Sequence, residues 1–413
     1  FDTFIPIQPD KKFNTKSQSF FKTYAVGVAT NRDAWSYNFS KNKLKFNMTR
    51  MIDFFNQQTK DYQNALKKNK ELKIEDFASK DLTKIKWTRA LRKYSVNNIS
   101  YEYEKDEVVD SYYRPFCKQR LYFHKPFIES PGLSSQFFPT KDTENFVICV
   151  TGIGASKDFS PIITNTIANL DSLEKAQSFP LNYYEEKETV QSSLFDGAGE
   201  GKYIRRDGVS DFVLNRANKL YGKSVNKEDV FYYVYGILHS KDYVETFVND
   251  LKKMLPRIPL IERPKDFWAF SKAGRQLAEL HVNYESVSAH PDVVIKGEES
   301  ESYTVEKMHF PKKEQKDIIL YNSKITLSNI PEKAYHYVVN GKPAIEWIME
   351  RYRVTIDLNK KGEGSGIKND PNDWSAEVDN PRYILDLLLS VINVSTQTVD
   401  IVNDLPKLDF EKL

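Results

Sequence analysis

The sequence has few side chains in the arrangements that metal binding or nucleophilic catalysis requires. Its two cysteines, Cys117 and Cys149, are too far apart for a Cys-x-x-Cys pair, and its six histidines form no His-Glu-x-x-His motif. Neither a Gly-x-Ser-x-Gly elbow nor a phosphate-binding Gly-x-x-x-x-Gly-Lys-Ser/Thr loop is present. We therefore predict no metal site and no catalytic residue in this chain.

Two glycine clusters could approach a cofactor. Phe-Asp-Gly-Ala-Gly at 195–199 resembles the S-adenosylmethionine loop of methyltransferases, but residues 202–208 do not open a helix. Thr-Gly-Ile-Gly at 151–154 follows an apolar strand, yet Lys157 occupies the place of the third glycine of a nucleotide-binding loop. Asn-Pro-Arg-Tyr at 380–383 lacks the second proline of the motif that holds an amino-methyl acceptor. A flexible loop and a tight turn are the favoured interpretations of the two clusters, and we expect no cofactor in this chain.

The remaining chemical signal is a set of cations among aromatic residues. The net charge of +3 conceals an asymmetry, because residues 1–130 contain 25 basic and 15 acidic side chains whereas residues 131–413 contain 35 and 42. Cations can neutralise phosphates while aromatic rings pack or stack. The alternative is that these are ordinary amphipathic faces with solvated cations. One group is Lys86, Arg89, Arg92 and Lys93 around Trp87, and the other is Arg114, Lys118, Arg120 and Lys125 among Tyr112, Tyr113, Phe116, Tyr122 and Phe123.

Helices and short strands must position these residues. Apolar spacing predicts a helix from Met48 and another around Trp87, and the apolar run at 146–150 predicts a central strand. Ser210, Asn226 with Asp229, and Ser240 are predicted helix caps. The pattern weakens between Gln177 and Asp207, where we expect a mobile connection. A further helix is predicted after Pro381.

These elements predict an α+β (mixed α/β) fold, with helices interspersed with short, mostly antiparallel sheets in two closely packed subdomains. The expected division is a basic N-terminal subdomain, 1–130, and a core subdomain, 131–413. No run of 18 uninterrupted apolar residues predicts a membrane span. Few cysteines fit a reducing cytoplasm. The absence of an initiating Met indicates a fragment of a longer protein.

Several segments resemble the C-terminal target-recognition region of type ISP restriction-modification enzymes, which are single polypeptides. The resemblance includes Tyr-Gly-Ile-Leu-His-Ser at 235–240 and Arg-Ile-Pro at 257–259. It extends from about residue 30 to residue 406 and is weakest at 177–207. The other segments lie at 30–40, 87–92, 113–116, 121–123, 206–211, 228–234, 267–274, 337–341 and 369–374.

The resemblance implies that a nuclease, a helicase-like ATPase and an adenine-N6 methyltransferase precede this region in one polypeptide. S-adenosylmethionine, ATP and Mg would then belong to those upstream domains, and residues 1–130 would adjoin the methyltransferase. The region itself would bind double-stranded DNA, recognise a short site and position the target adenine for base flipping. The upstream domains would carry out ATP-dependent cleavage.

Within that interpretation, phosphate contacts set the register and base-edge contacts specify sequence. We assign the stripes at 231–240 and 267–274 to the core. Two alternatives stay open: a methyltransferase fragment with its own S-adenosylmethionine contacts, and a protein-interaction module without DNA contact. The expected phosphate contacts are Arg32, Arg89, Arg92, Arg114, Lys118 and Arg120, the expected groove contacts are Lys202, Arg205 and Arg206, and weaker base-contact candidates are Gln119 and Asn165.

Overall fold

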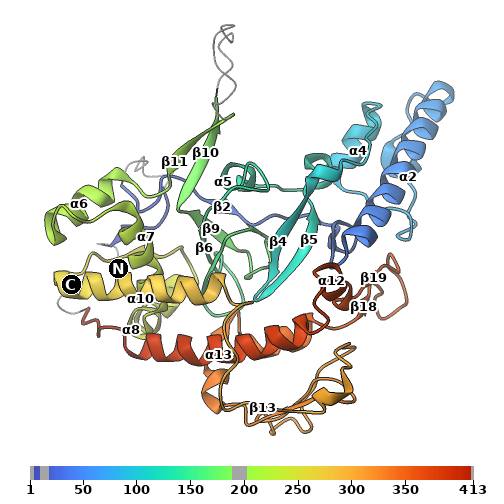
Figure 1. Cartoon of the computed structure of the whole chain (residues 1–413). Helices are drawn as coiled ribbons and strands as arrows, with labels where there is room; N and C mark the ends of the chain where they lie inside the picture. The colour runs from blue at the N-terminus through green and yellow to red at the C-terminus, as the bar shows by residue number, and fades with distance from the viewer. Residues whose placement is uncertain (1–3, 10–17, 188–201, 411–413) are drawn as a thin grey trace, which may run out of the picture.

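The computed structural model describes residues 4–9, 18–187 and 202–410. Small sheets lie at its centre, a group of helices packs on one side, and a long helical arm extends on the other (Figure 1). The predicted fold class is confirmed, because helices alternate with small sheets whose strands are almost all antiparallel. The four longest helices are α2 (Lys41–Lys68), α7 (Lys227–His239), α10 (Pro264–Val282) and α13 (Tyr383–Asn403).

Two four-stranded sheets form the centre. In the first, β6 (Val147–Val150) is buried along its whole length and pairs antiparallel with β7 and β9, so the predicted central strand is confirmed. In the second, β4 pairs antiparallel with β5 and parallel with β8. The strand orders are β2 (Ala25–Val26), β9 (Gln177–Pro180), β6, β7 (Pro161–Thr164) in one sheet and β3 (Tyr37–Asn38), β5 (Cys117–Tyr122), β4 (Val108–Arg114), β8 (Ile167–Ala168) in the other.

Capped helices form the layer beside these sheets. Ser210 and Ser240 accept hydrogen bonds from backbone N–H groups three residues on, and Asn226 and Asp229 form a reciprocal capping box, so all three predicted caps are confirmed. Helix α10 packs against both α7 and α13. The helices and strands of this layer that are not yet named are α6 (Asp211–Tyr221), α8 (Lys241–Thr246), α9 (Val248–Leu251), β1 (Ile5–Pro6) and β12 (Arg257–Ile258).

The helical arm consists of α2, α4 (Arg89–Val96), which packs on it, and α3 (Ile74–Phe77), which packs on α4 and contacts Tyr62 of α2 through Phe77. Leu44, Met48, Ile52 and Phe55 are buried along α2 and join Trp35 in one apolar cluster. The helix begins at Lys41, earlier than predicted, because Ser40 caps it by accepting from the Lys43 N–H. The short elements near the arm are α1 (Asp33–Ser36), η1 (Lys105–Glu107) and η2 (Lys125–Phe127), whereas α5 (Ser134–Phe137) contacts β8 and the hairpin strand β10 (Asn182–Glu186).

The C-terminal third adds small sheets around α13. Asn340 and Gly341 both have positive φ and form the two-residue turn that joins β16 to β17. Its remaining elements are β13 (Val294–Lys296), η3 (Glu298–Ser300), β14 (Ile319–Leu320), β15 (Thr326–Ser328), η4 (Glu332–His336), β16 (Val338–Val339), β17 (Lys342–Pro343), α11 (Ala344–Arg351), β18 (Thr355–Ile356), β19 (Lys368–Asn369) and α12 (Asn372–Glu377).

The prediction of a mobile connection between Gln177 and Asp207 is wrong for its described part. This segment contains β9, which pairs with both β2 and β6, and the hairpin strands β10 (Asn182–Glu186) and β11 (Tyr203–Asp207). The glycine cluster at 197–201 lies outside the described residues. The other cluster forms the expected turn, with Gly154 at φ +69.

The division at residue 130 stays a prediction, and three sheets cross it. Strand β1 pairs with β12, β2 pairs with β9, and β4 pairs with β8. Of the described helices, α13 is long and apolar enough to cross a membrane by length and composition, but 72% of its apolar window is buried inside the structure. Its contacts with α10, α11 and η4 make it a core helix.

Candidate nucleic-acid interface

Two adjoining hollows of about 860 and 1400 Å³ open between the two sides of the molecule. We call them together the central cleft. They share the loop at 140–143 and the turn at 165–166, which form the floor beside α5. The hairpin β10–β11 stands on one side of α5, and the arm stands on the other (Figure 1). The larger hollow alone exceeds the roughly 300–1,000 Å³ of an ordinary small-molecule pocket, so the cleft suits a larger ligand.

Charges of both signs line the cleft. Lys41, Lys125 and Lys141 lie in the smaller hollow with Asp106 and Asp110. In the larger hollow, Arg205 and Arg275 lie with Glu228 and Glu279. Phosphate groups would be repelled by these carboxylates, whereas base edges offer both donors and acceptors. The lining therefore favours contact with bases over contact with phosphates.

The floor carries polar groups that the sequence analysis largely missed. Thr140 and Thr143 form a closed turn through their hydroxyls, and exposed Lys141 lies between them. Asn165 is exposed and lines both hollows, so this weaker base-contact candidate lies in the cleft. No periodicity marks the loop at 140–143, and only its threonines hint at a turn.

The hairpin places the three predicted groove cations differently. Lys202 pairs with Glu186 at 2.9 Å, and Arg206 pairs with Glu185 at 3.0 Å. Arg205 is exposed and lines the larger hollow together with Tyr184. Of the cations in 202–207, Arg205 is the one directed into the central cleft.

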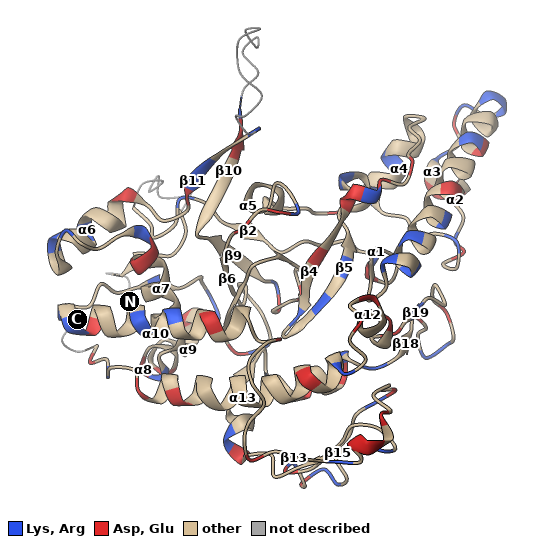
Figure 2. Cartoon of the chain, viewed as in Figure 1, with Lys and Arg blue, Asp and Glu red and all other residues tan. Residues whose placement is uncertain are grey.

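Arg89 and Arg92 lie on α4 in the arm, and neither lines the central cleft. Thr88 caps α4, and Leu91 fixes it in the core, so Arg89 is exposed and Arg92 is half-buried. The helix packs against η2, whose Lys125 lines the cleft. Figure 2 shows Lys and Arg positions, in blue, along α2 and α4. A phosphate contact from this helix stays a prediction that the geometry permits.

Arg114 and Lys118 have acidic partners within the protein. The Arg114 guanidinium lies 4.0 Å from the Tyr113 ring centroid and within 4 Å of Asp33 and Asp171. Lys118 binds Glu285 at 2.5 Å. Their charges are already neutralised, which weakens the prediction that they contact phosphates.

Gln119 and Arg120 belong to the joint between β5 and the C-terminal segment. Gln119 is buried and accepts from the Asn369 amide at 3.1 Å. Arg120 is paired with Asp110, and its guanidinium lies 3.7 Å from the centroid of the Trp374 ring. Both side chains therefore hold the fold together, and neither lines the central cleft.

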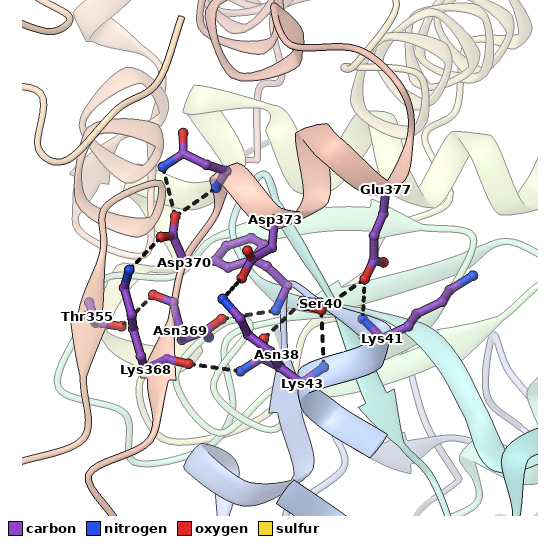
Figure 3. Close-up of polar contacts among 12 residues, drawn as sticks. Asn38, Ser40, Lys41, Lys43, Thr355, Lys368, Asn369, Asp370, Asp373 and Glu377 are labelled. Atoms are coloured by element: carbon purple, nitrogen blue, oxygen red, sulfur yellow. Dashed lines mark hydrogen bonds and ion pairs between the residues drawn. The ribbon is translucent and has the colours of Figure 1, made fainter. Parts of the chain in front are cut away.

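The same joint holds the start of α2 through a polar cluster (Figure 3). The Glu377 carboxylate accepts from Ser40 Oγ at 3.0 Å and from the Lys41 N–H at 2.7 Å. Lys43 pairs with Asp373 at 2.6 Å. A carboxylate at a helix N-terminus is favourable because the first N–H groups lack intrahelical partners. Helix α12 thereby fixes the base of the arm.

Arg32 is buried, with an exposed fraction of 1%. Its Nη2 donates to Thr88 Oγ1 at 2.6 Å, whereas its Nε and Nη1 have no hydrogen-bond partner among the described residues. Burial lowers the pKa of Arg32 to about 9. This placement argues against direct phosphate contact and makes Arg32 a link between α1 and the start of α4.

The described residues contain no group of three His, Cys, Asp or Glu that could hold a metal ion. Both cysteines are buried and unpaired, and burial raises the pKa of each thiol to about 12. They are therefore unreactive at neutral pH.

Comparison with known proteins identifies the family to which this fold belongs. The model of the Type ISP C-terminal specificity domain matches residues 19–387. The chain belongs to this family. The specificity domain superposes on a nuclease-deletion mutant of the Type ISP restriction-modification enzyme LlaGI in complex with a DNA substrate mimic, at a TM-score of 0.82 and 34% identity. It also resembles the ATP-dependent Type ISP enzyme LlaBIII bound to DNA, at a TM-score of 0.84 and 34% identity, and DrdV in a DNA complex, at 0.79 and 26%.

The specificity domain spans only part of these structures. The alignments cover 99%, 99% and 98% of this chain, but 34%, 24% and 38% of the LlaGI, LlaBIII and DrdV chains. No curated protein matches the sequence.

Proposed function

We propose that this specificity domain recognises a short sequence in double-stranded DNA for a restriction-modification enzyme. The observation that carries the proposal is the central cleft, whose mixed polar lining lies between the hairpin and the basic arm in a fold shared with DNA-bound enzymes. Recognition would position a target adenine for a neighbouring N6-adenine methyltransferase domain and direct ATP-dependent cleavage by upstream domains.

The proposal divides the contacts between two regions. Arg89 and Arg92 on the arm contact phosphates and set the register of the duplex, and the floor and hairpin contact base edges. The proposal includes no cofactor for this chain. S-adenosylmethionine, ATP and Mg are assigned to the methyltransferase and helicase-like domains of the same polypeptide. A cytoplasmic location is part of the proposal and agrees with two unpaired thiols.

The test is a duplex-binding titration of the intact polypeptide at several salt concentrations. The wild type is expected to lose affinity steeply as salt rises. Arg89→Ala with Arg92→Ala should weaken binding to every sequence alike, and should reduce the slope of log K against log salt by about 2, at roughly 0.9 for each lost phosphate contact.

The matched control is Lys252→Ala with Lys253→Ala. It removes the same charge from exposed positions that do not line the central cleft. Equal losses in both double variants would contradict a specific role for α4. Absence of duplex binding would favour a protein-interaction module, and calorimetric binding of S-adenosylmethionine to this chain alone would favour a methyltransferase fragment.

A further inference from the structure

The hairpin β10–β11 presents two chemically different faces. Side chains alternate along each strand, and Tyr184 is paired directly opposite Arg205. Both line the larger hollow, as does Asn182, two residues from Tyr184 on the same face. Arg206 and Glu185 occupy the opposite face, where they form their ion pair. The alternation therefore places Arg205 on the cleft face and the Arg206–Glu185 pair on the outer face.

Arg205 has no charged partner on the cleft face. Its cross-strand neighbour is a tyrosine, and no ion pair or hydrogen bond from its guanidinium is formed with the described residues. The hairpin's other two described arginine or lysine side chains in 202–207 are both paired. Five N–H donors in a rigid fork are thus held on a strand, available to a ligand in the cleft.

The surroundings of Arg205 indicate a base rather than a phosphate. Across the larger hollow lie the carboxylates of Glu228 and Glu279 on α7 and α10. Arg275 pairs with Glu228 at 3.6 Å, but Glu279 forms no ion pair with the described residues, so a phosphate in that hollow would be repelled by Glu279 whereas a neutral guanine edge would not. A two-stranded ribbon also fits the major groove, which is about 12 Å wide, and an arginine fork there matches O6 and N7 of guanine.

We propose that Arg205 is a specificity-determining residue that donates two hydrogen bonds to the O6 and N7 of a guanine. The β10–β11 ribbon lies in the major groove, and Tyr184 packs beside the guanidinium. This assignment rests on the proposed function, because it names the base that the same cleft recognises. Asn165, on the floor of the cleft, faces the same duplex from another element.

The experiment is a selection of bound duplexes from a randomised library, followed by sequencing, with the intact polypeptide. The variants are Arg205→Ala, Arg205→Lys and, as the matched control on the outer face, Arg206→Ala. The wild type should require guanine at one position. Arg205→Ala should lose that preference by about 5- to 140-fold, with the other positions unchanged. Arg206→Ala should retain it.

The lysine variant separates a base contact from a phosphate contact. Lysine keeps the charge but not the bidentate fork, so it should not restore the guanine preference. Two outcomes would overturn the assignment: an unchanged preference in Arg205→Ala, or an equal loss on all sequences that Arg205→Lys restores. A wild type that binds duplexes without any sequence preference would overturn the proposed function as well. Equal thermal unfolding of all variants checks that the exposed substitutions leave the fold intact.

Discussion

Replacing Gly274 with alanine should force helices α7 and α10 apart. A Cβ at Gly274 would lie 1.9 Å from the Tyr232 carbonyl oxygen, and a Cβ at Gly236 would lie 2.3 Å from the Phe270 carbonyl oxygen. The two glycines thus let each backbone touch the other. Because real Cβ atoms essentially never come closer than 3.0 Å to such atoms, one helix must shift by at least about 1 Å.

The cost follows from this geometry. Overpacking a buried interface costs about 1–3 kcal/mol, and a backbone obstacle belongs at the upper end because it cannot change rotamer. Alanine returns about 1 kcal/mol through its better helix propensity. The expected net loss of unfolding free energy is therefore about 2 kcal/mol. The shift would also displace Arg275 and Glu279, which line the cleft from α10.

Urea unfolding of Gly274→Ala, with hydrogen exchange across α7 and α10, measures this loss. Gln276→Ala, an exposed substitution on the same helix, is the control and should stay within about 0.5 kcal/mol of the wild type. Gly274→Ser should be at least as destabilising as alanine. If Gly274→Ala were as stable as Gln276→Ala, the close approach of the two backbones would be refuted.

Two further predictions concern buried histidines and the base of the arm. Burial lowers the pKa of His239 to about 4 and lowers that of His281, so the folded state keeps them neutral where the unfolded state takes up protons. The free energy of unfolding should therefore decrease as the pH drops below about 6.5. His239 alone should account for a decrease of about 2 kcal/mol between pH 7.5 and pH 5, so the decrease should be smaller in His239→Asn. Urea titrations at the two pH values check this, and parallel losses in both proteins would contradict it. Glu377→Ala should lower the free energy of unfolding by about 1 kcal/mol, because it removes the carboxylate that accepts from Ser40 Oγ and the Lys41 N–H. The nearby control Asp379→Asn should leave the free energy of unfolding unchanged. Equal unfolding midpoints for the two variants would refute the role of Glu377.

The helix caps and apolar stripes could be predicted from the sequence because the contacts that form them lie within a few residues. The caps at Ser210, Asn226 and Ser240 bond to N–H groups three residues away, so their patterns are complete within one helical turn. The stripes at 231–240 and 267–274 are buried as expected because helical spacing defines a face. The helix that Ser240 caps, α8, ends at Thr246, and α9 follows it at Val248–Leu251.

Strand β9 and the partners of the basic residues could not be predicted, because they depend on contacts between segments far apart in the sequence. Strand β9 owes its structure to β2 and β6, which come from other parts of the chain. The partner of each cation was equally hidden, since Lys118 pairs with Glu285 and the Arg120 guanidinium lies over the Trp374 ring, and both partners are far along the sequence. A basic residue near aromatics could not be assigned to a phosphate or to a carboxylate before those partners were known.

The polar cluster at Ser40 and Glu377 fixes the direction of α2 and therefore the position of the far end of the arm. Helix α2 has 28 residues and so a length of about 42 Å, at 1.5 Å per residue. A rotation of 5° at its base would move its far end by about 4 Å, close to the roughly 3.4 Å that one strand of a duplex rises along the helix axis per phosphate. The orientation of the arm therefore depends on Glu377, which lies more than 300 positions along the sequence from the first turn of α2. Under the proposed function, substitutions in α12 would change which phosphates the arm contacts without altering any residue of the arm.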